Sequence, residues 1–240
     1  MSLSMRRVRA IFVKELREYG RNRSLVAAMA LYPLIFTVQP LIAIFAAPSA
    51  TAASIAGRHE LTFMLGIPIL VPAALAAFAV AGERQQETLE PVLATPITRE
   101  EFLLGKALAV FLPSLVIAYF VFALFIAVVE LFAKPGIAPA LISTDDVIVQ
   151  VLFTPLLAAW SIWVGIAVST RSNDVRVAQQ LSVLSSLPLI LVTIMFSFNI
   201  IQPSFELVVL IGVLLFVADV IGWRLIAPLF NREKLISGPH

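Results

Sequence analysis

Few residues in this chain are of a type and spacing that could carry out chemistry. A phosphate-binding loop requires G-x-x-x-x-G-K followed by Ser or Thr. Gly105-Lys106 is the nearest match, but Glu100 takes the place of the first glycine and Ala107 that of the hydroxyl residue. The only histidines are His59 and His240, and cysteine is absent, so we expect neither a zinc site nor a serine–histidine pair. We predict a chain without catalytic residues, metal ligands or a cofactor of its own.

Two polar features interrupt the long apolar runs. Asp219 lies well inside one run, where a carboxylate costs at least about 2.5–3.5 kcal/mol, so it should face other helices. Its role is either a site for substrate or switching, or an interhelical hydrogen bond, with Arg224 as a partner if the helix bends. Another run, broken by Pro188, carries small polar residues that can join helices or line a path: Ser182, Ser185, Ser186, Ser197 and Asn199.

The charged stretch GERQQETLEPVLATPITREEFLLGK, residues 82–106, has the signals of a short helix followed by a longer one. Thr88 is a candidate N-cap for a stub of two turns at most, which Pro96 ends. Leu89, Val92 and Leu93 share one face of that stub. A helix so short is unstable alone in water. It must pack either on the chain's own helix ends and the lipid head groups, or in a groove of another subunit.

A second helix is predicted to begin after Thr98, where T-R-E-E has the form of a capping box. The Thr98 hydroxyl can accept from the Glu101 amide while the Glu101 carboxylate accepts from the Thr98 amide. This helix continues into an apolar run.

Composition indicates that the elements carrying these residues lie in a membrane. The 240 residues are 60% hydrophobic and 13% charged, against about 45–50% and about 25% in soluble domains. A spanning helix needs about 20 mostly apolar residues, and the chain is predicted to have six, at residues 25–46, 61–81, 102–129, 147–168, 178–201 and 206–229. We predict an all-α membrane protein forming one transmembrane domain, residues 1–240.

Residues 1–24 are predicted to form an amphipathic interfacial helix that precedes the first span. Val8, Phe12, Leu16 and Tyr19 fall on one face, with Ile11 beside it, while most basic residues lie elsewhere. Such a helix lies along the membrane surface. The alternative is a plain basic flank that only fixes the topology.

The distribution of basic residues predicts the orientation. All but two of the 17 lysine and arginine residues, Arg58 and Lys134, fall on one side of the six spans. The positive-inside rule then places both termini and the loop at residues 82–101 in the cytoplasm. The formal net charge of +2 is too small to indicate binding of nucleic acid.

The stretch from Glu83 to Lys106 resembles the cytoplasmic loop of ABC-2 type transporter permeases. In that family a Glu-Arg pair is followed by Thr-Leu-Glu, apolar residues, Thr-Pro, acidic residues and Leu-Leu-Gly-Lys. The order of six spans and the basic N-terminal helix also fit. One departure is Glu87, where many members have glycine.

The resemblance implies half of an export channel in a prokaryotic inner membrane, paired with a second copy or a homologue and surrounded by lipid. Two separate ATPase subunits would bind ATP and magnesium. The loop would supply a coupling helix that docks on the ATPase, and the second and fifth spans would border the path, so the polar residues at 182–199 are candidates for lining it. The implied coupling residues are Glu83, Arg84, Thr88, Leu89, Glu90, Val92 and Leu93.

Two other kinds of protein fit the same runs. An ion-coupled secondary carrier would use ionisable residues and broken helices in the membrane, for which Asp219 and Pro188 are thin support. A non-transporting membrane scaffold would need no path at all.

Overall fold

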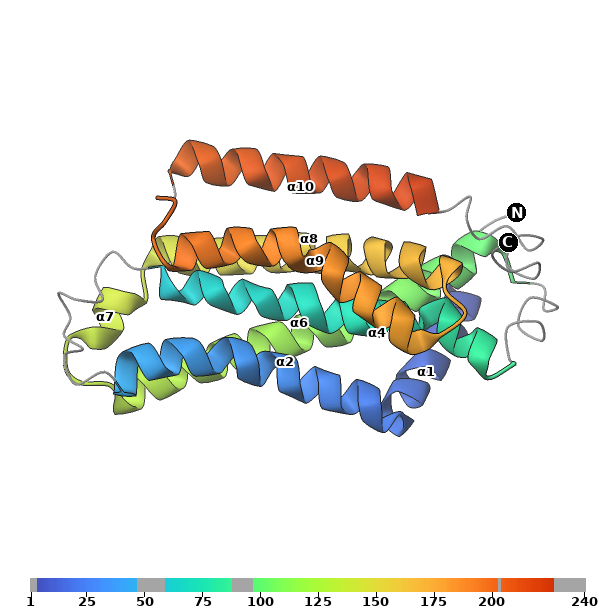
Figure 1. Cartoon of the computed structure of the whole chain (residues 1–240), viewed down its shortest axis with the longest axis horizontal. Helices are drawn as coiled ribbons and strands as arrows, with labels where there is room; N and C mark the ends of the chain where they lie inside the picture. The colour runs from blue at the N-terminus through green and yellow to red at the C-terminus, as the bar shows by residue number, and fades with distance from the viewer. Residues whose placement is uncertain (1–3, 47–58, 88–96, 203, 227–240) are drawn as a thin grey trace.

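A computed structural model describes residues 4–46, 59–87, 97–202 and 204–226, and the described chain is helical without strands (Figure 1). The helices run α1 Met5–Arg21, α2 Arg23–Leu41, α4 Gly66–Gln85, α6 Arg99–Phe132, α7 Ile137–Leu141, α8 Thr144–Arg171, α9 Val175–Ser197 and α10 Phe205–Ile226. A π-helical turn, Ile42–Ala46, extends α2, and a 3₁₀ turn, Glu60–Leu65, leads into α4. This confirms the predicted all-α class.

Six of these segments are long and apolar enough to cross a membrane, as the sequence predicts. They lie side by side along the long axis, with α10 at one edge and α1 across one end (Figure 1). α4 continues to Gln85, past the predicted limit at residue 81, and α6 begins at Arg99. The start of α6 agrees with the helix predicted after Thr98, so the region 82–101 predicted as the coupling loop includes the last residues of α4 and the first residues of α6.

The fifth span ends earlier than the predicted residue 201 because a backbone motif stops it. The amide of Ile200 donates to the carbonyl of Met195, and the amide of Asn199 donates to that of Phe196. Asn199 has a φ of 56°. This is the Schellman ending, in which a residue in the left-handed region satisfies the last carbonyls of the helix.

α4 forms the centre of the bundle, and α10 forms its edge. In the span that contains α4, 94% of the most apolar stretch is buried inside the bundle, against 11% of the corresponding stretch of α10. Small residues allow α8 to approach α4 closely, since a β-carbon on Gly165 would lie 2.7 Å from that of Ala76. In lipid, where hydrophobicity drives little association between helices, such close packing holds them together.

α1 packs its buried face on the start of α6, with Val8, Ile11, Glu15 and Tyr19 inside. Phe12 and Leu16, predicted on the apolar face, are only half-buried, while the carboxylate of Glu15 was not expected there. A β-carbon on Gly105 would lie 2.8 Å from Ile11 and 3.2 Å from the carbonyl of Val8. Only glycine at this position lets α1 lie so close.

We expect Gly105→Ala to destabilise the protein by about 1–3 kcal/mol, because the added methyl overpacks the contact between α1 and α6. The free energy of unfolding in mild detergent measures this. Gly20→Ala is the matched control, because nothing lies within 4 Å of its β-carbon. It should be neutral or stabilising by up to about 1 kcal/mol, and equal effects of the two changes would contradict the packing explanation.

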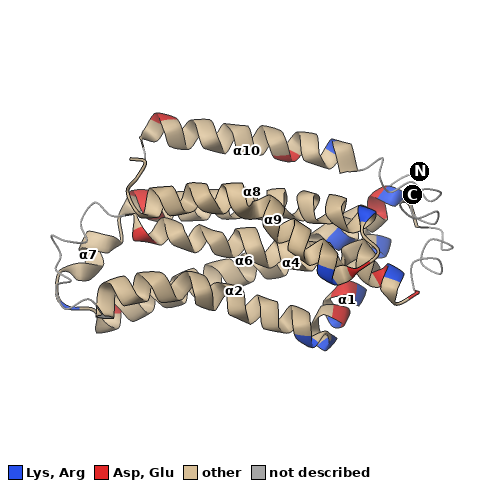
Figure 2. Ribbon diagram, viewed as in Figure 1, with Lys and Arg blue, Asp and Glu red and all other residues tan. Residues whose placement is uncertain are grey.

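Charged residues gather at the end of the bundle crossed by α1 (Figure 2). The long central parts of the spans are almost free of charge in the described chain, with Asp219 of α10 as an exception. A bilayer core requires such a distribution.

Candidate functional site

Lys106 of α6 is the centre of a charged cluster beneath α1. Its side chain is 0% exposed, and its ammonium group lies 2.7 Å from Oε1 of Glu15 in α1 and 2.9 Å from Oε1 of Glu83 in α4. The ring of Phe102 lies 4.9 Å from the same nitrogen. One buried cation thus joins α4 and α6 to α1, which is distant from both in the sequence.

Lys14 completes this cluster from the solvent side. Its ammonium group lies 2.8 Å from Oε1 of Glu83 and 3.5 Å from Oε1 of Glu15. Partial burial disfavours its charge, but the attraction of the carboxylates of Glu83 and Glu15 is greater, so the pKa of Lys14 lies above its ordinary value. Two cations therefore balance two carboxylates, which buried charges require. We call Lys14, Glu15, Glu83 and Lys106 the charge cluster.

Arg84, next to the charge cluster, fastens the end of α4 to the end of α8. Its guanidinium donates to the carbonyl of Ser172 at 2.8 Å, to Oδ1 of Asn173 at 3.2 Å and to the carbonyl of Thr170 at 3.4 Å. These carbonyls belong to the last turn of α8, where a cation is favourable. Glu83 and Arg84, predicted to lie where the second span meets the loop, therefore connect α4 to different helices. Glu83 binds α1 and α6, and Arg84 binds α8.

One turn before the C-cap residue of α8, to which Arg84 donates, the hydroxyl of Ser169 binds the backbone of α4. It donates to the carbonyl of Ala77 at 2.6 Å and accepts from the amides of Val80 at 3.0 Å and Ala81 at 2.9 Å. Together with Arg84, this contact joins the ends of α4 and α8 at two successive turns.

The predicted capping box forms at the start of α6. The Glu101 amide donates to the Thr98 hydroxyl at 3.2 Å, and the Thr98 amide donates to the Glu101 carboxylate at 3.0 Å. Glu101 also accepts from the amide of Ser4 at 2.7 Å and from Arg7 at 3.3 Å. The cap therefore also holds the start of α1, which the sequence did not indicate.

The stub itself, with Thr88, Leu89, Glu90, Val92 and Leu93, lies outside the described residues. Its two anchors are described, with α4 and Glu83-Arg84 before it, and Thr98 and Glu101 after it. Between α4 and the stub, Glu87 has a φ of 56°. This left-handed region favours glycine. Glycine is also the residue that many ABC-2 type permeases, which this loop resembles, have at this position.

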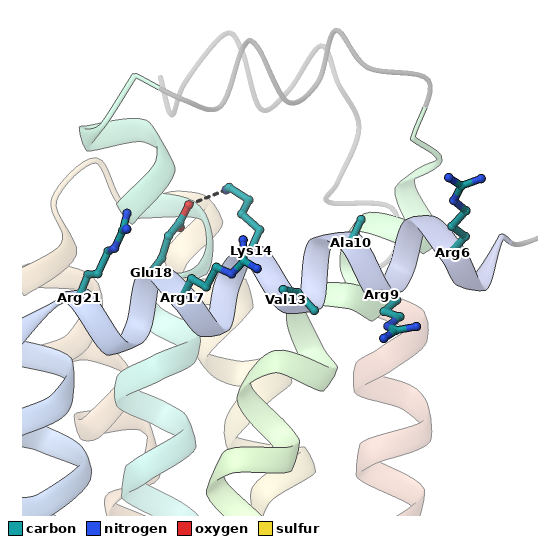
Figure 3. A pocket seen from close by; sticks show the side chains of 8 residues that line it. All are labelled: Arg6, Arg9, Ala10, Val13, Lys14, Arg17, Glu18 and Arg21. Carbon is teal, nitrogen blue, oxygen red and sulfur yellow. Dashed lines mark ion pairs between the residues drawn. The ribbon is translucent and has the colours of Figure 1, made fainter.

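The exposed face of α1 is basic, and Figure 3 shows Arg6, Lys14 and Arg21 pointing away from the spans, whereas Arg9 points to the side of the spans. This face lines a shallow groove of about 520 Å³ with Arg6, Arg9, Ala10, Val13, Lys14, Arg17, Glu18 and Arg21. Lys14 and Glu18 pair at 3.1 Å across one turn. α1 therefore contacts the bundle through one face and presents cations on the other.

The intramembrane carboxylate of Asp219 interacts with α8. The indole Nε1 of Trp163 donates to its Oδ1 at 3.2 Å. Among the described residues Arg224 forms no ion pair with it, because five residues along a helix turn the side chain by about 140° and α10 runs straight (Figure 1). The described contact is an interhelical hydrogen bond.

The polar residues of α9 divide between the interior and the outside. Ser182, Ser186 and Ser197 are buried, whereas Ser185 and Asn199 are exposed. The hydroxyls of residues 182, 185 and 186 donate to carbonyls four residues earlier in their own helix. Their part in lining a path stays a prediction.

The sequence analysis did not identify three members of the charge cluster as site residues: Lys14, Glu15 and Lys106. A signal for them existed, since Glu15 falls between Ile11 and Tyr19 on the buried face of α1 and Lys106 stands within an apolar run. A buried acid on one helix and a buried base on another predict a pair, but not which helices meet.

Comparison with known families gives one result that decides the class. The model of the ABC-2 family transporter proteins matches residues 9–227. The chain belongs to the ABC-2 transporter family. It is a membrane component of an ABC transporter, and the matched region of this permease includes the charge cluster, both anchors of the stub and all six spans. No curated protein matches the chain.

Proposed function

We propose that this permease forms half of the path of an ATP-driven exporter and is driven through the loop between α4 and α6. Two ATPase subunits bind ATP and magnesium, and a second permease, identical or homologous, completes the path. The basic end of the bundle faces the cytoplasm of a prokaryotic inner membrane, and both termini lie in the cytoplasm. The observation that supports this best is the attachment of both ends of the loop to neighbouring helices by buried ionic and hydrogen bonds.

The contacts suggest how force on the stub reaches the spans. A push on residues 88–96 acts on Glu83-Arg84 at one side and on Thr98 at the other. Through the charge cluster α1, α4 and α6 move together, and through Arg84 and Ser169 the end of α8 follows α4. Closure of the ATPases would thus displace several spans at once and open the path outward.

Purification from native membranes in mild detergent tests the proposal. An ATPase subunit should co-purify with this chain, and ATP should drive transport by the reconstituted complex. A secondary carrier or a scaffold would be isolated without an ATPase, and transport driven by an ion gradient in the absence of ATP would overturn the proposal.

Arg84→Ala is expected to uncouple the complex more than it destabilises the permease. Loss of the guanidinium removes the hydrogen bonds described above at a partly buried position, worth about 1–3 kcal/mol together, and leaves Ser169 as the remaining described hydrogen-bonded contact between the ends of α4 and α8. We expect ATP hydrolysis to continue while transport per ATP falls at least severalfold. The measurement is the ratio of transport to hydrolysis in proteoliposomes. Arg176→Ala, on the neighbouring exposed turn of α9, is the control, and an unchanged ratio in Arg84→Ala would contradict the role of this residue.

A further inference from the structure

A second site lies in the membrane part of the bundle, in a cavity that the coupling function does not use. It has a volume of about 180 Å³ and is partly open between α6, α8 and α10. Its walls include Leu104 and Phe111 of α6, Ala159 and Trp163 of α8, and Asp219 and Trp223 of α10. All walls are apolar or aromatic except for one carboxylate.

That carboxylate is incompletely satisfied by the protein. Oδ1 of Asp219 accepts from Trp163, but Oδ2 is buried and accepts no hydrogen bond from the described residues. None of the described lysine or arginine side chains forms an ion pair with it. An acid inside a span is costly and ordinarily faces a partner. A cationic ligand in the cavity that Asp219 lines would supply a counter-charge for the carboxylate.

The aromatic walls favour a cation of organic type. The faces of indole rings attract ammonium groups, and the attraction increases when water is excluded. Trp163 is held in place on two sides: the ring of Trp160 packs edge-on at 4.7 Å, and Gly222 lies so close that a β-carbon there would come within 2.4 Å of the indole. A rigid indole beside an acid is a favourable site for an alkylammonium group.

Size and depth indicate what is attached to this cation. Cavities that enclose a whole drug-sized ligand measure about 300–1,000 Å³, so about 180 Å³ suits a head group with its chain outside. Asp219 lies seven residues before Ile226, the last described residue of α10, which places it about 10 Å along the helix from that end. A chain leaving the cavity there enters the apolar part of one leaflet.

We propose that this cavity binds the ammonium head of a lipophilic cation, with Asp219 as its counter-charge and Trp163 and Trp223 beside it. The ligand class is an amphiphile with a single aliphatic ammonium group and an alkyl chain, taken up from the leaflet on the side of α1. This inference goes beyond coupling to an ATPase, because it concerns binding by the permease alone.

Intrinsic fluorescence of the full chain in dodecyl maltoside tests the proposal directly. The three tryptophans of the sequence either line the cavity or pack on one that does. We use three probes with the same chain, decyltrimethylammonium, decyl alcohol and decyl sulfate. The cation should change the fluorescence saturably, and the neutral and anionic probes should not compete with it.

Two variants and one control assign the effect to the cavity. Asp219→Asn keeps the shape and an acceptor for Trp163, and should weaken binding of the cation on the order of tenfold or more, as for loss of a desolvated charge pair. Ala159→Phe fills the cavity without changing the carboxylate and should weaken binding similarly. Asp145→Asn removes an exposed acid at the start of α8 and should have no effect.

Equal saturable binding of all three probes would overturn the proposal, since the cavity would then be a general apolar site. Wild-type affinity for the cation in Asp219→Asn would also overturn it and leave Asp219 as an interhelical hydrogen bond only. If Asp219→Asn does not fold, Ala159→Phe decides, because unchanged affinity in that variant excludes the cavity. No ATPase and no ATP are present, so a negative result leaves the proposed coupling function untouched.

Discussion

Replacing Lys106 with methionine is expected to destabilise the permease by about 3–5 kcal/mol, since removal of one partner from a buried ionic group leaves the others uncompensated. Methionine has nearly the length and volume of lysine, so the change removes the charge and leaves the packing almost intact. Glu15 and Glu83 would then be buried close together with only Lys14, which is 36% exposed, to balance both. The free energy of unfolding, from denaturant titration in mild detergent micelles, measures the effect.

Lys134→Met is the matched control for this change. Lys134 is exposed between α6 and α7, and its loss should alter the stability by less than about 0.5 kcal/mol. Equal stability of the two variants would show that the charge cluster is not needed to hold the three helices together.

A double variant separates the charge effect from packing. Glu15→Gln removes the acid that is closest to Lys106, at 2.7 Å, while Glu83 keeps its contact with Lys14. Glu15→Gln combined with Lys106→Met should therefore cost less than the sum of the single changes, with a coupling energy of about 1–3 kcal/mol. Additive losses would mean that Glu15 and Lys106 act independently despite their contact.

The charge cluster also explains why the sequence predicted the helices better than the site. The spans and the cap at Thr98 depend on local patterns: a run of apolar residues must be helical in lipid, and Glu101 reaches an amide only three residues away. Glu15 and Lys106 are 91 residues apart, and their contact depends on α1 crossing the bundle at Gly105. Local periodicity contains no information about that crossing.

The same difference between local and long-range information appears in two details of the membrane part. The limit of the fifth span at residue 201 was drawn from hydropathy, which cannot register that Asn199 adopts a left-handed conformation and ends the helix. For Asp219 the sequence favours a hydrogen bond to another helix, with Arg224 as a partner only if the helix bends, but it does not say which helix; the described partner, Trp163, comes from α8. In both cases the backbone or a neighbouring helix decided the outcome.

The structure explains the last part of the loop pattern, Leu-Leu-Gly-Lys at residues 103–106, in physical terms. Leu103 is buried in the core, Gly105 admits α1, and Lys106 neutralises Glu15 and Glu83. A stretch that resembles a docking loop in sequence thus contains, in its last four residues, the joint between the loop and the N-terminal helix. We expect changes there to affect the permease alone, and changes in the stub to affect its partner.

Leu93→Asp is the change that tests the second half of that expectation. If Leu89, Val92 and Leu93 enter a groove of the ATPase, each contributes about 1.5–3 kcal/mol on burial. An aspartate at residue 93 loses this contribution and must also be desolvated, so the affinity for the ATPase should fall on the order of 100-fold or more. Co-purification and ATP-driven transport should be lost, while membrane insertion is kept because the loop belongs to no span. Gln86→Glu adds the same charge at an exposed position of the loop and should retain both activities.

Stability of the isolated permease distinguishes docking on a partner from packing on the chain itself. A stub that packs on its own helix ends would make Leu93→Asp unfold more easily without any ATPase present, by about 2–5 kcal/mol as for other losses of a buried leucine. A stub that docks on the ATPase leaves the isolated chain as stable as before and changes only the complex. Since Lys106→Met destabilises the permease by itself, the two variants should behave oppositely, and a Leu93→Asp protein with normal transport would show that force enters the bundle by another route.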